Sequence, residues 1–372
     1  MNHLVLYRKH RPTHFDDVVG QGSVVNAIQN AIKTGRVAHA YLFSGPRGVG
    51  KTTMARLIAK SLNCERHKDD ADTVSVPCNV CASCREFADG RTLDVIEIDA
   101  ASNRGIDEIR ELRDAVRFVP TGGRYKTYII DEVHMLTTPA FNALLKTLEE
   151  PPSHAVFILA TTELEKVPAT IISRTQHYSF RRPSVEETIG RLAAVAKKES
   201  VSLESDAAHL IAFSAGGSLR DAEGILGQIM AVEDKKITRR EVEETLGMPP
   251  REAAKKLFAF IAEKKTSEAL ALAEELHEAG HDAGGFIRMI LQYFRSALLM
   301  KIDPALKKFI AEELLPDEME AILRYLPTIP EAQLTHAVRT ISDNLMRFKN
   351  NPIPQLPLEV TIVELCTELQ KS

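Results

Sequence analysis

A glycine-rich octapeptide, "GPRGVGKT" at residues 45–52, restricts the possible folds of this chain more than any other stretch. It matches the phosphate-loop pattern G-x-x-x-x-G-K-[ST] at every fixed position. An apolar run typical of a buried strand precedes it, and a helical pattern at 51–62 follows it. This strand–loop–helix context, which the phosphate-binding mechanism requires, argues against a chance match. The octapeptide therefore predicts a nucleotide site, with Lys51 at the β and γ phosphates and Thr52 as a ligand of Mg²⁺.

Short apolar runs alternate with helical patterns along the first half of the chain. The predicted strands are 40–45, 93–100, 125–132 and 155–162, and the predicted helices between them are 51–62, 106–118 and 138–149. Such alternation predicts an α/β domain with a parallel sheet that is covered on both faces. Active residues are then expected at the carboxyl ends of the strands.

The pattern changes near residue 180, because the predicted strands stop after "HYSFRRPS" and only helical patterns follow. Two capping boxes, "SVEE" at 184–187 and "TRRE" at 238–241, indicate the starts of helices. We therefore predict three domains: an α/β phosphate-loop domain at 1–180, a small helical domain at 181–245 and an all-helical domain at 246–372. The broad apolar faces of the last domain indicate burial within its own bundle, or association with other subunits.

The stretch "YIIDEVH" places two carboxylates at the end of a predicted strand, about 80 residues after the phosphate loop. Taken alone, an Asp-Glu pair such as Asp131 and Glu132 after a strand is more typical of a helix N-cap than of a catalytic site. In an alternating α/β pattern the catalytic interpretation is favoured, with Asp131 holding Mg²⁺ through water and Glu132 polarising the attacking water. Thr161 and Thr162 end the next predicted strand, where a hydroxyl could contact that water or the γ-phosphate.

The motifs "GPRGVGKT", "IIDEVHML", "NALLKTLEEPP", "ATTELEKVPATIISR" and "GSLRDA" together resemble the AAA+ ATPases of the clamp-loader group. The segment "YRKHRPTHFDDVVGQ" and a cysteine-rich loop after residue 62 make the chain similar to the gamma/tau family of bacterial DNA polymerase III. The resemblance is dense from about residue 4 to residue 245 and looser beyond. It implies that the domain at 181–245 is a lid and that the domain at 246–372 is an oligomerisation collar.

The resemblance also implies roles for individual residues. Glu132, Lys51, the polar sensor Thr162 and the arginine finger Arg174 would be catalytic, Arg174 acting on a neighbouring subunit's nucleotide. Arg220 would be a second sensor at the γ-phosphate, although a lone arginine such as Arg174 or Arg220 is by itself more typical of a surface ion pair. Thr175 stands where the family often has cysteine, with little expected consequence. The implied nucleotide-binding residues are Gly45, Pro46, Arg47, Gly48, Val49, Gly50, Lys51, Thr52, Thr53, Asp131 and Arg220, with Arg11, Pro12, Val18 and Val19 around the adenine.

Four of the five cysteines lie close together in the sequence: Cys64, Cys78, Cys81 and Cys84. The N-terminus lacks a signal-peptide pattern and no apolar run approaches membrane-spanning length, so a cytoplasmic location is expected and disulfides are disfavoured. Four thiolates can close a tetrahedral structural zinc site, in a module at about 64–84. Thiol redox chemistry and unmetallated cysteines are the alternatives. The fifth, Cys366, is interpreted as a small buried hydrophobe.

The predicted function is that of an ATP-dependent motor subunit that loads a sliding clamp onto primed DNA during replication, with ATP, Mg²⁺ and structural Zn²⁺ as cofactors. The implied partners are sister subunits of the delta and delta-prime type, copies of the chain itself, the clamp and primed DNA. Contacts with helicase and polymerase would use regions outside this chain. A cytoplasmic, nucleoid-associated location without membrane contact is expected. The alternatives are a non-hydrolysing nucleotide-binding scaffold and an AAA+ helicase or branch-migration motor.

Overall fold

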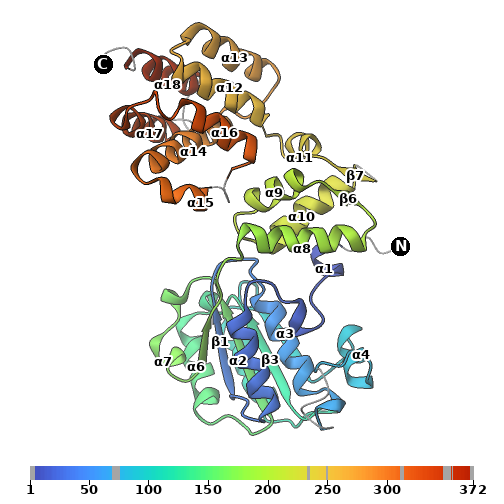
Figure 1. Ribbon diagram of the computed structural model, residues 1–372. Helices are drawn as coiled ribbons and strands as arrows, with labels where there is room; N and C mark the ends of the chain where they lie inside the picture. The colour runs from blue at the N-terminus through green and yellow to red at the C-terminus, as the bar shows by residue number, and fades with distance from the viewer. Residues whose placement is uncertain are drawn as a thin grey trace. The chain divides into compact units, whose positions relative to one another are not determined.

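The chain forms two compact units in this computed structural model (Figure 1). The first comprises Met1–Val195 with Ala215–Gly224, and the second comprises Ala196–Ser214 with Ile225–Ser372. The structure describes residues 5–68, 76–232, 235–248, 250–310, 314–346, 353 and 355–368. The first unit is built on a parallel sheet, and the second is almost entirely helical. The division into three domains at 180 and 245 stays a prediction.

Five parallel strands form the sheet of the first unit, in the order β2-β3-β4-β1-β5. Their bounds are β1 Ala40–Ser44, β2 Val95–Asp99, β3 Lys126–Asp131, β4 Ala155–Thr161 and β5 Gln176–Ser179. Ser44 is aligned with Thr161, and Ile130 with Leu159. The carboxyl ends of β3, β4 and β1 therefore lie side by side, and the three polar motifs of the sequence follow these three strands.

Helices cover both faces of this sheet, as the alternation of strand and helix predicts. Successive strand residues point to opposite faces. Tyr41 and Phe43 pack with residues of α2 (Gly22–Lys33) and α3 (Lys51–Leu62). Leu42 packs on the other side, with residues of α5 (Ile106–Val116), α6 (Thr138–Glu149) and α7 (Ala169–Ile172). The result is a three-layer α/β/α arrangement, in which α3 begins directly at the phosphate loop.

Short elements complete the first unit. They are α1 Leu6–Lys9, η1 Phe15–Asp17, η2 Glu65–Lys68, α4 Ala82–Ala88, η3 Val133–Met135 and η4 Leu164–Lys166. Two helices, α8 (Val185–Lys198) and α10 (Leu219–Met230), run from the first unit into the second. The predicted capping box at the start of α8 is confirmed, because the N–H of Ser184 donates to Glu187 at 2.8 Å and the N–H of Glu187 donates to Ser184 Oγ at 3.1 Å.

The second unit contains a helical bundle with its own apolar core. Its elements are β6 Ser202–Leu203, α9 Ser205–Ser214, β7 Lys236–Ile237, α11 Arg239–Thr245, α12 Arg251–Ala262, α13 Thr266–Glu278, α14 Ala283–Ile302, η5 Pro304–Leu306, α15 Lys307–Ile310, α16 Pro316–Tyr325, α17 Glu331–Leu345 and α18 Leu356–Glu368. Phe258 of α12 packs against Phe294 of α14, with ring centroids 5.0 Å apart. Cys366 is fully buried in this core, as predicted.

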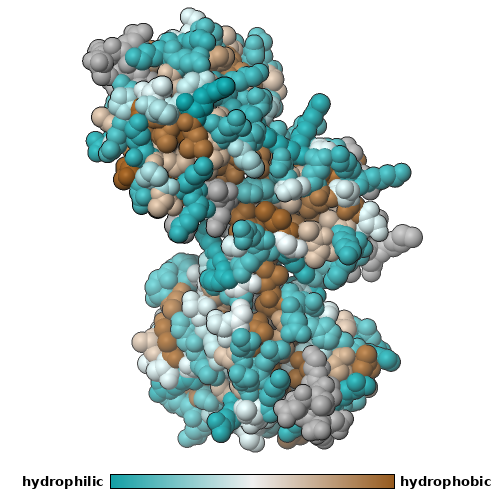
Figure 2. Space-filling view, viewed as in Figure 1, coloured by the Kyte–Doolittle hydropathy of each residue, from teal (hydrophilic) through white to brown (hydrophobic). Residues whose placement is uncertain are grey.

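The surface is mixed in polarity. Hydrophilic residues cover much of the face visible in Figure 2, and apolar residues form separate patches there. Among the helices that the structure describes, none combines the length and the apolar character needed to cross a membrane.

Three local features differ from the sequence predictions. The strand β5 was not among the four predicted strands, because its residues "QHYS" lie mostly exposed at the edge of the sheet and form no apolar run. The two-residue strands β6 and β7 pair in parallel within the helical region, and two residues carry no periodic signal. The helix predicted at 106–118 ends at Val116, and the exposed Phe118 and Val119 follow it.

Candidate nucleotide site and cysteine cluster

The phosphate loop joins β1 to α3 in a conformation that requires glycine. Gly48 has φ 78° and Gly50 has φ 102°, both in the left-handed region. A Cβ atom on Gly48 would lie 2.0 Å from Ser218 Oγ, so no side chain fits there. The N–H of Leu219 donates to the carbonyl of Gly48 at 3.1 Å. The loop is therefore a tight backbone cradle that packs against residues 218–219.

Lys51 begins α3 and is only 6% exposed. Its Nζ donates to the carbonyl oxygens of Gly45 and Pro46, each at 2.7 Å. Burial lowers the pKa of the Lys51 ammonium, while Glu132 and Asp131 act in the opposite direction. The ammonium is thus held on the loop itself, where a nucleotide's phosphates bind in proteins with this motif.

The residue after Lys51 contacts the end of β3. Thr52 Oγ1 donates to Asp131 Oδ2 at 2.7 Å, and Asp131 Oδ1 accepts the N–H of Glu132 at 3.0 Å. A hydroxyl and a carboxylate on adjacent elements are oxygen ligands of the kind that Mg²⁺ takes. Thr52 and Asp131 are accordingly the side chains that could hold the metal.

Glu132 has an unusual backbone conformation, with φ 49° and ψ 44°. A residue other than glycine in this region costs about 1–3 kcal/mol and is often found at functional sites. Its carboxylate Oε2 accepts a hydrogen bond from Thr162 Oγ1 at 2.9 Å. The structure thus brings together the predicted catalytic glutamate and the predicted polar sensor.

A cavity lies over these groups. Its described lining includes Arg47 to Thr53, Asp131, Glu132 and Arg220, and also the predicted adenine contacts Arg11, Pro12, Val18 and Val19. Gly45 and Pro46 instead supply the carbonyls that bind Lys51. Arg11 Nη1 is buried without a hydrogen-bond partner, which leaves a donor available to a ligand. The cradle, the ammonium and this donor fit a nucleoside triphosphate.

Sequence reasoning missed several residues that line the cavity. They are Tyr7, Asp17, Arg191, Leu219 and Glu223. The guanidinium of Arg220 lies over the ring of Tyr7, and its carbon Cζ is 5.5 Å from the ring centroid. Arg191 and Glu223 form a buried ion pair at 2.6 Å. Tyr7 and Asp17 lie in the segment "YRKHRPTHFDDVVGQ" and Leu219 lies in "GSLRDA", so these motifs could have pointed to them. No local pattern distinguishes Arg191 and Glu223 from ordinary helix residues.

Arg174 lies elsewhere in the first unit, just after α7. It is outside the set of described residues that line the cavity. Its Nη2 pairs with Glu149 Oε1 at 2.8 Å, and its Nη1 donates to the carbonyl of Thr170 at 2.9 Å. The side chain of Arg174 is 35% exposed and that of Glu149 is 49% exposed. The arginine is therefore a surface group that a neighbouring molecule could reach.

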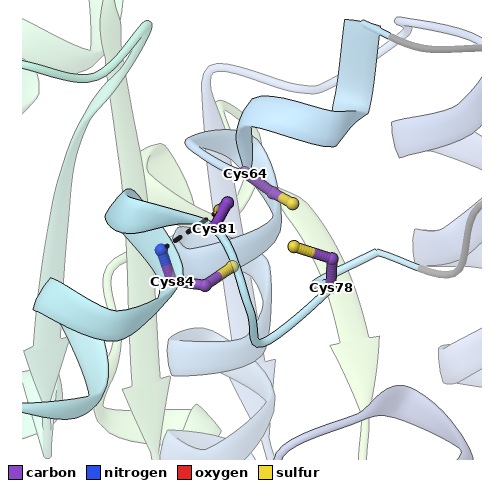
Figure 3. A group of neighbouring side chains, drawn as sticks. All are labelled: Cys64, Cys78, Cys81 and Cys84. Carbon is purple, nitrogen blue, oxygen red and sulfur yellow. Dashed lines mark hydrogen bonds between the residues drawn. The ribbon is translucent and has the colours of Figure 1, made fainter.

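Four cysteine sulfur atoms converge beside α4 (Figure 3). The ligand atoms of Cys64, Cys78, Cys81 and Cys84 all lie within 4.8 Å of one another. Zn–S bonds of about 2.3 Å in a tetrahedron would separate the sulfurs by about 3.8 Å, so the cluster is close to zinc geometry. Cys81 caps α4, and its Sγ accepts the N–H of Cys84 at 3.4 Å. The donor set fits structural zinc.

The pKa values of the cysteines in the cluster are shifted in different directions. Burial raises the pKa values of Cys64 and Cys84. Burial would also raise the pKa of Cys78, but the N–H groups of Val80 and Cys81 lower it to about 7. Cysteines bind metal as thiolates, so metal binding would have to release protons from the two buried thiols.

The fold and the loop together define a P-loop nucleotide-binding protein with a helical C-terminal region. Three family models match the chain: DNA polymerase III, delta subunit, at residues 20–184; DNA polymerase III clamp loader subunit, ATPase lid domain, at 188–234; and DNA polymerase III subunits gamma and tau domain III, at 237–371. The chain belongs to the gamma/tau family of DNA polymerase III clamp-loader ATPases.

Curated relatives agree with this assignment. The DNA polymerase III subunit tau of Bacillus subtilis is 41% identical over 380 residues, covering 100% of this chain and 65% of the relative. The tau subunit of Escherichia coli is 38% identical over 98% of this chain and 55% of the relative. The gamma subunit of Buchnera aphidicola from Schizaphis graminum is 41% identical, over 82% of each chain. The chain thus spans less than two thirds of the length of these two tau relatives.

Proposed function

We propose that this chain is an ATP-hydrolysing motor subunit of the DNA polymerase III clamp loader, which places a sliding clamp on primed DNA during replication. The observation that carries the proposal is the meeting of four groups at one cavity: Lys51, Thr52, Asp131 and Glu132. A scaffold that only binds nucleotide has no need of a glutamate held at this place by a threonine hydroxyl.

Each residue would have a defined task in hydrolysis. The loop N–H groups and Lys51 bind the phosphates, and Thr52 and Asp131 hold Mg²⁺, which neutralises charge on the β and γ phosphates when bound. Glu132 orients and polarises the attacking water, and Thr162 keeps its carboxylate in place. Arg220 contacts the γ-phosphate, and Tyr7 supports its guanidinium.

Membership of the family supports the proposed assembly. Arg174 would act on the nucleotide of a neighbouring subunit, since it lies outside its own chain's cavity. The neighbours would be copies of this chain and subunits of the delta and delta-prime type. The match of three family models to successive segments supports a division into a phosphate-loop domain, a lid and a collar. A cytoplasmic location near the nucleoid belongs to the same proposal, as do contacts with helicase and polymerase through regions outside this chain.

The proposed function predicts how the ATPase rate responds to partners. Sister subunits, clamp and primed DNA would be added to the chain separately and together. We expect the highest rate only with all three, because ATP would be turned over at subunit boundaries during loading. A rate that rises with DNA length and ignores the clamp would indicate a translocating motor instead. Nucleotide binding with no hydrolysis under any condition would indicate a scaffold.

The cysteine cluster predicts about one tightly held zinc per chain. Cys84→Ser should lose the zinc and lower the free energy of unfolding by about 3 kcal/mol or more, because the metal folds a segment with little apolar core. Elemental analysis and thermal unfolding would measure both effects. The buried Cys366, remote in sequence from the cluster, provides the control: Cys366→Ala should keep its zinc. Carefully purified protein without zinc would contradict the assignment.

A further inference from the structure

A histidine lies beside the catalytic glutamate and has no role in the function proposed so far. His134 belongs to η3, two residues after Glu132, and its side chain is only 5% exposed. Its Nδ1 lies 3.0 Å from Thr161 Oγ1 and 3.5 Å from Glu132 Oε2. Its Nε2 lies 3.2 Å from Glu163 Oε1. The imidazole thus bridges the glutamate and the residues that follow β4.

The far side of the ring is anchored to the main chain and to η4. The N–H of Glu163 donates to Thr161 Oγ1 at 3.0 Å, and the carboxylate of Glu163 pairs with Lys166 at 2.7 Å. Because an ionised carboxylate only accepts, Nε2 must donate to Glu163. The ring is therefore fixed at Nε2, and in the neutral ring Nδ1 accepts the hydroxyl hydrogen of Thr161. The same edge of the ring lies beside the carboxylate of Glu132, at 3.5 Å from Oε2, without donating a hydrogen bond to it.

The glutamate itself is held by few contacts. Its backbone is in the left-handed region, and the hydrogen bond from Thr162 reaches the same oxygen, Oε2, that faces His134. One hydroxyl donor leaves the carboxylate free to rotate about that bond. An anchored ring against the same oxygen restricts the rotation.

We propose that His134 is a positioning residue that fixes the carboxylate of Glu132 toward the attacking water; this rests on the proposed hydrolytic role of Glu132. His134 does not touch the nucleotide cavity, since it is outside the described lining. Of its three contacts Thr161, Glu163 and Glu132, only Glu132 is among the described residues that line the cavity, so His134 should affect turnover and leave ATP binding unchanged. A misplacement of about 1 Å at a reacting group costs roughly 10²-fold in rate.

The test compares three substitutions in the full chain, assembled with its sister subunits. His134→Ala should lower kcat by roughly 10- to 100-fold with unchanged ATP affinity. His134→Asn places its amide near the position of Nδ1 and should recover most of the rate. His134→Gln reaches toward Glu163 and should recover little. Single-turnover hydrolysis and equilibrium binding of a fluorescent ATP analogue separate the two effects.

A second histidine provides the matched control. His154 lies in the same unit, and its ring faces only the carbonyl of Val116 in the described contacts, at 3.0 Å. His154→Ala should cost stability but leave kcat unchanged. Wild-type kcat in His134→Ala, or equal losses in the Asn, Gln and His154→Ala variants, would overturn the inference. Equal rates of ATP hydrolysis in the wild type and in Lys51→Ala would instead overturn the proposed function.

Discussion

Arg174→Ala is expected to lower ATP hydrolysis by the assembled complex by roughly 10³-fold or more, because an arginine supplied from a neighbour stabilises the phosphoryl transition state by that order. ATP binding by the isolated chain should stay nearly unchanged, since Arg174 is outside the described lining of its own cavity. Steady-state ATPase assays with clamp and primed DNA, beside nucleotide binding to the single chain, measure the two quantities.

The structure supplies the control that this prediction needs. Arg174 pairs with Glu149 on the surface, and exposed pairs of this kind contribute about 0–1 kcal/mol. If the arginine served only that pair, Glu149→Ala and Arg174→Ala would have the same small effects. We expect Glu149→Ala to hydrolyse ATP at close to the wild-type rate.

Assemblies that contain two different variants of the chain test the shared site more directly. Chains with Arg174→Ala and chains with Lys51→Ala should together recover part of the activity, at boundaries where an intact loop meets an intact arginine. Wild-type hydrolysis by complexes of Arg174→Ala alone, with clamp and primed DNA present, would exclude the shared site.

The parts of the site that sequence predicted are those encoded in contiguous stretches. The phosphate loop needs glycines at fixed positions for its backbone, and the helix at 51–62 begins where the motif ends. The pair Asp131–Glu132 could be placed because a buried apolar strand precedes it. The cysteine cluster could be predicted from spacing alone, since four thiols in so short a stretch can reach one another.

The parts that sequence missed depend on contacts between distant segments. Arg191 donates to the carbonyl of His10 and pairs with Glu223, and neither partner is visible from the helical pattern around Arg191. His134 belongs to the motif "IIDEVHML", but the motif predicts no role for it, because its contacts with Thr161 and Glu163 exist only after β3 and β4 pair. The strand β5 was missed for the opposite reason, since its exposed edge position needs no apolar residues.

Glu132→Gln should separate nucleotide binding from hydrolysis more cleanly than any other substitution in the site. The amide has the shape of the carboxylate, and its oxygen can still accept the hydrogen bond from Thr162. Gln has no basic oxygen to polarise the water, however, and loss of such a group lowers rates by about 10²- to 10⁴-fold. Lys51 and the loop are unchanged, so ATP affinity should remain within about threefold of wild type, well under 1.4 kcal/mol.

This variant therefore has a consequence for the whole cycle. If ATP binding organises the assembly and hydrolysis releases the clamp and DNA, Glu132→Gln complexes should bind clamp and primed DNA in the presence of ATP and fail to release them. Lys51→Ala complexes should fail at the earlier step and bind no clamp in response to ATP. Clamp retention on labelled primed DNA, followed with time after mixing with ATP, distinguishes the two. Release of the clamp at the wild-type rate by Glu132→Gln complexes would show that hydrolysis is not the step that ends loading. If the ATPase rate of Glu132→Gln were also that of the wild type, Glu132 would not be catalytic.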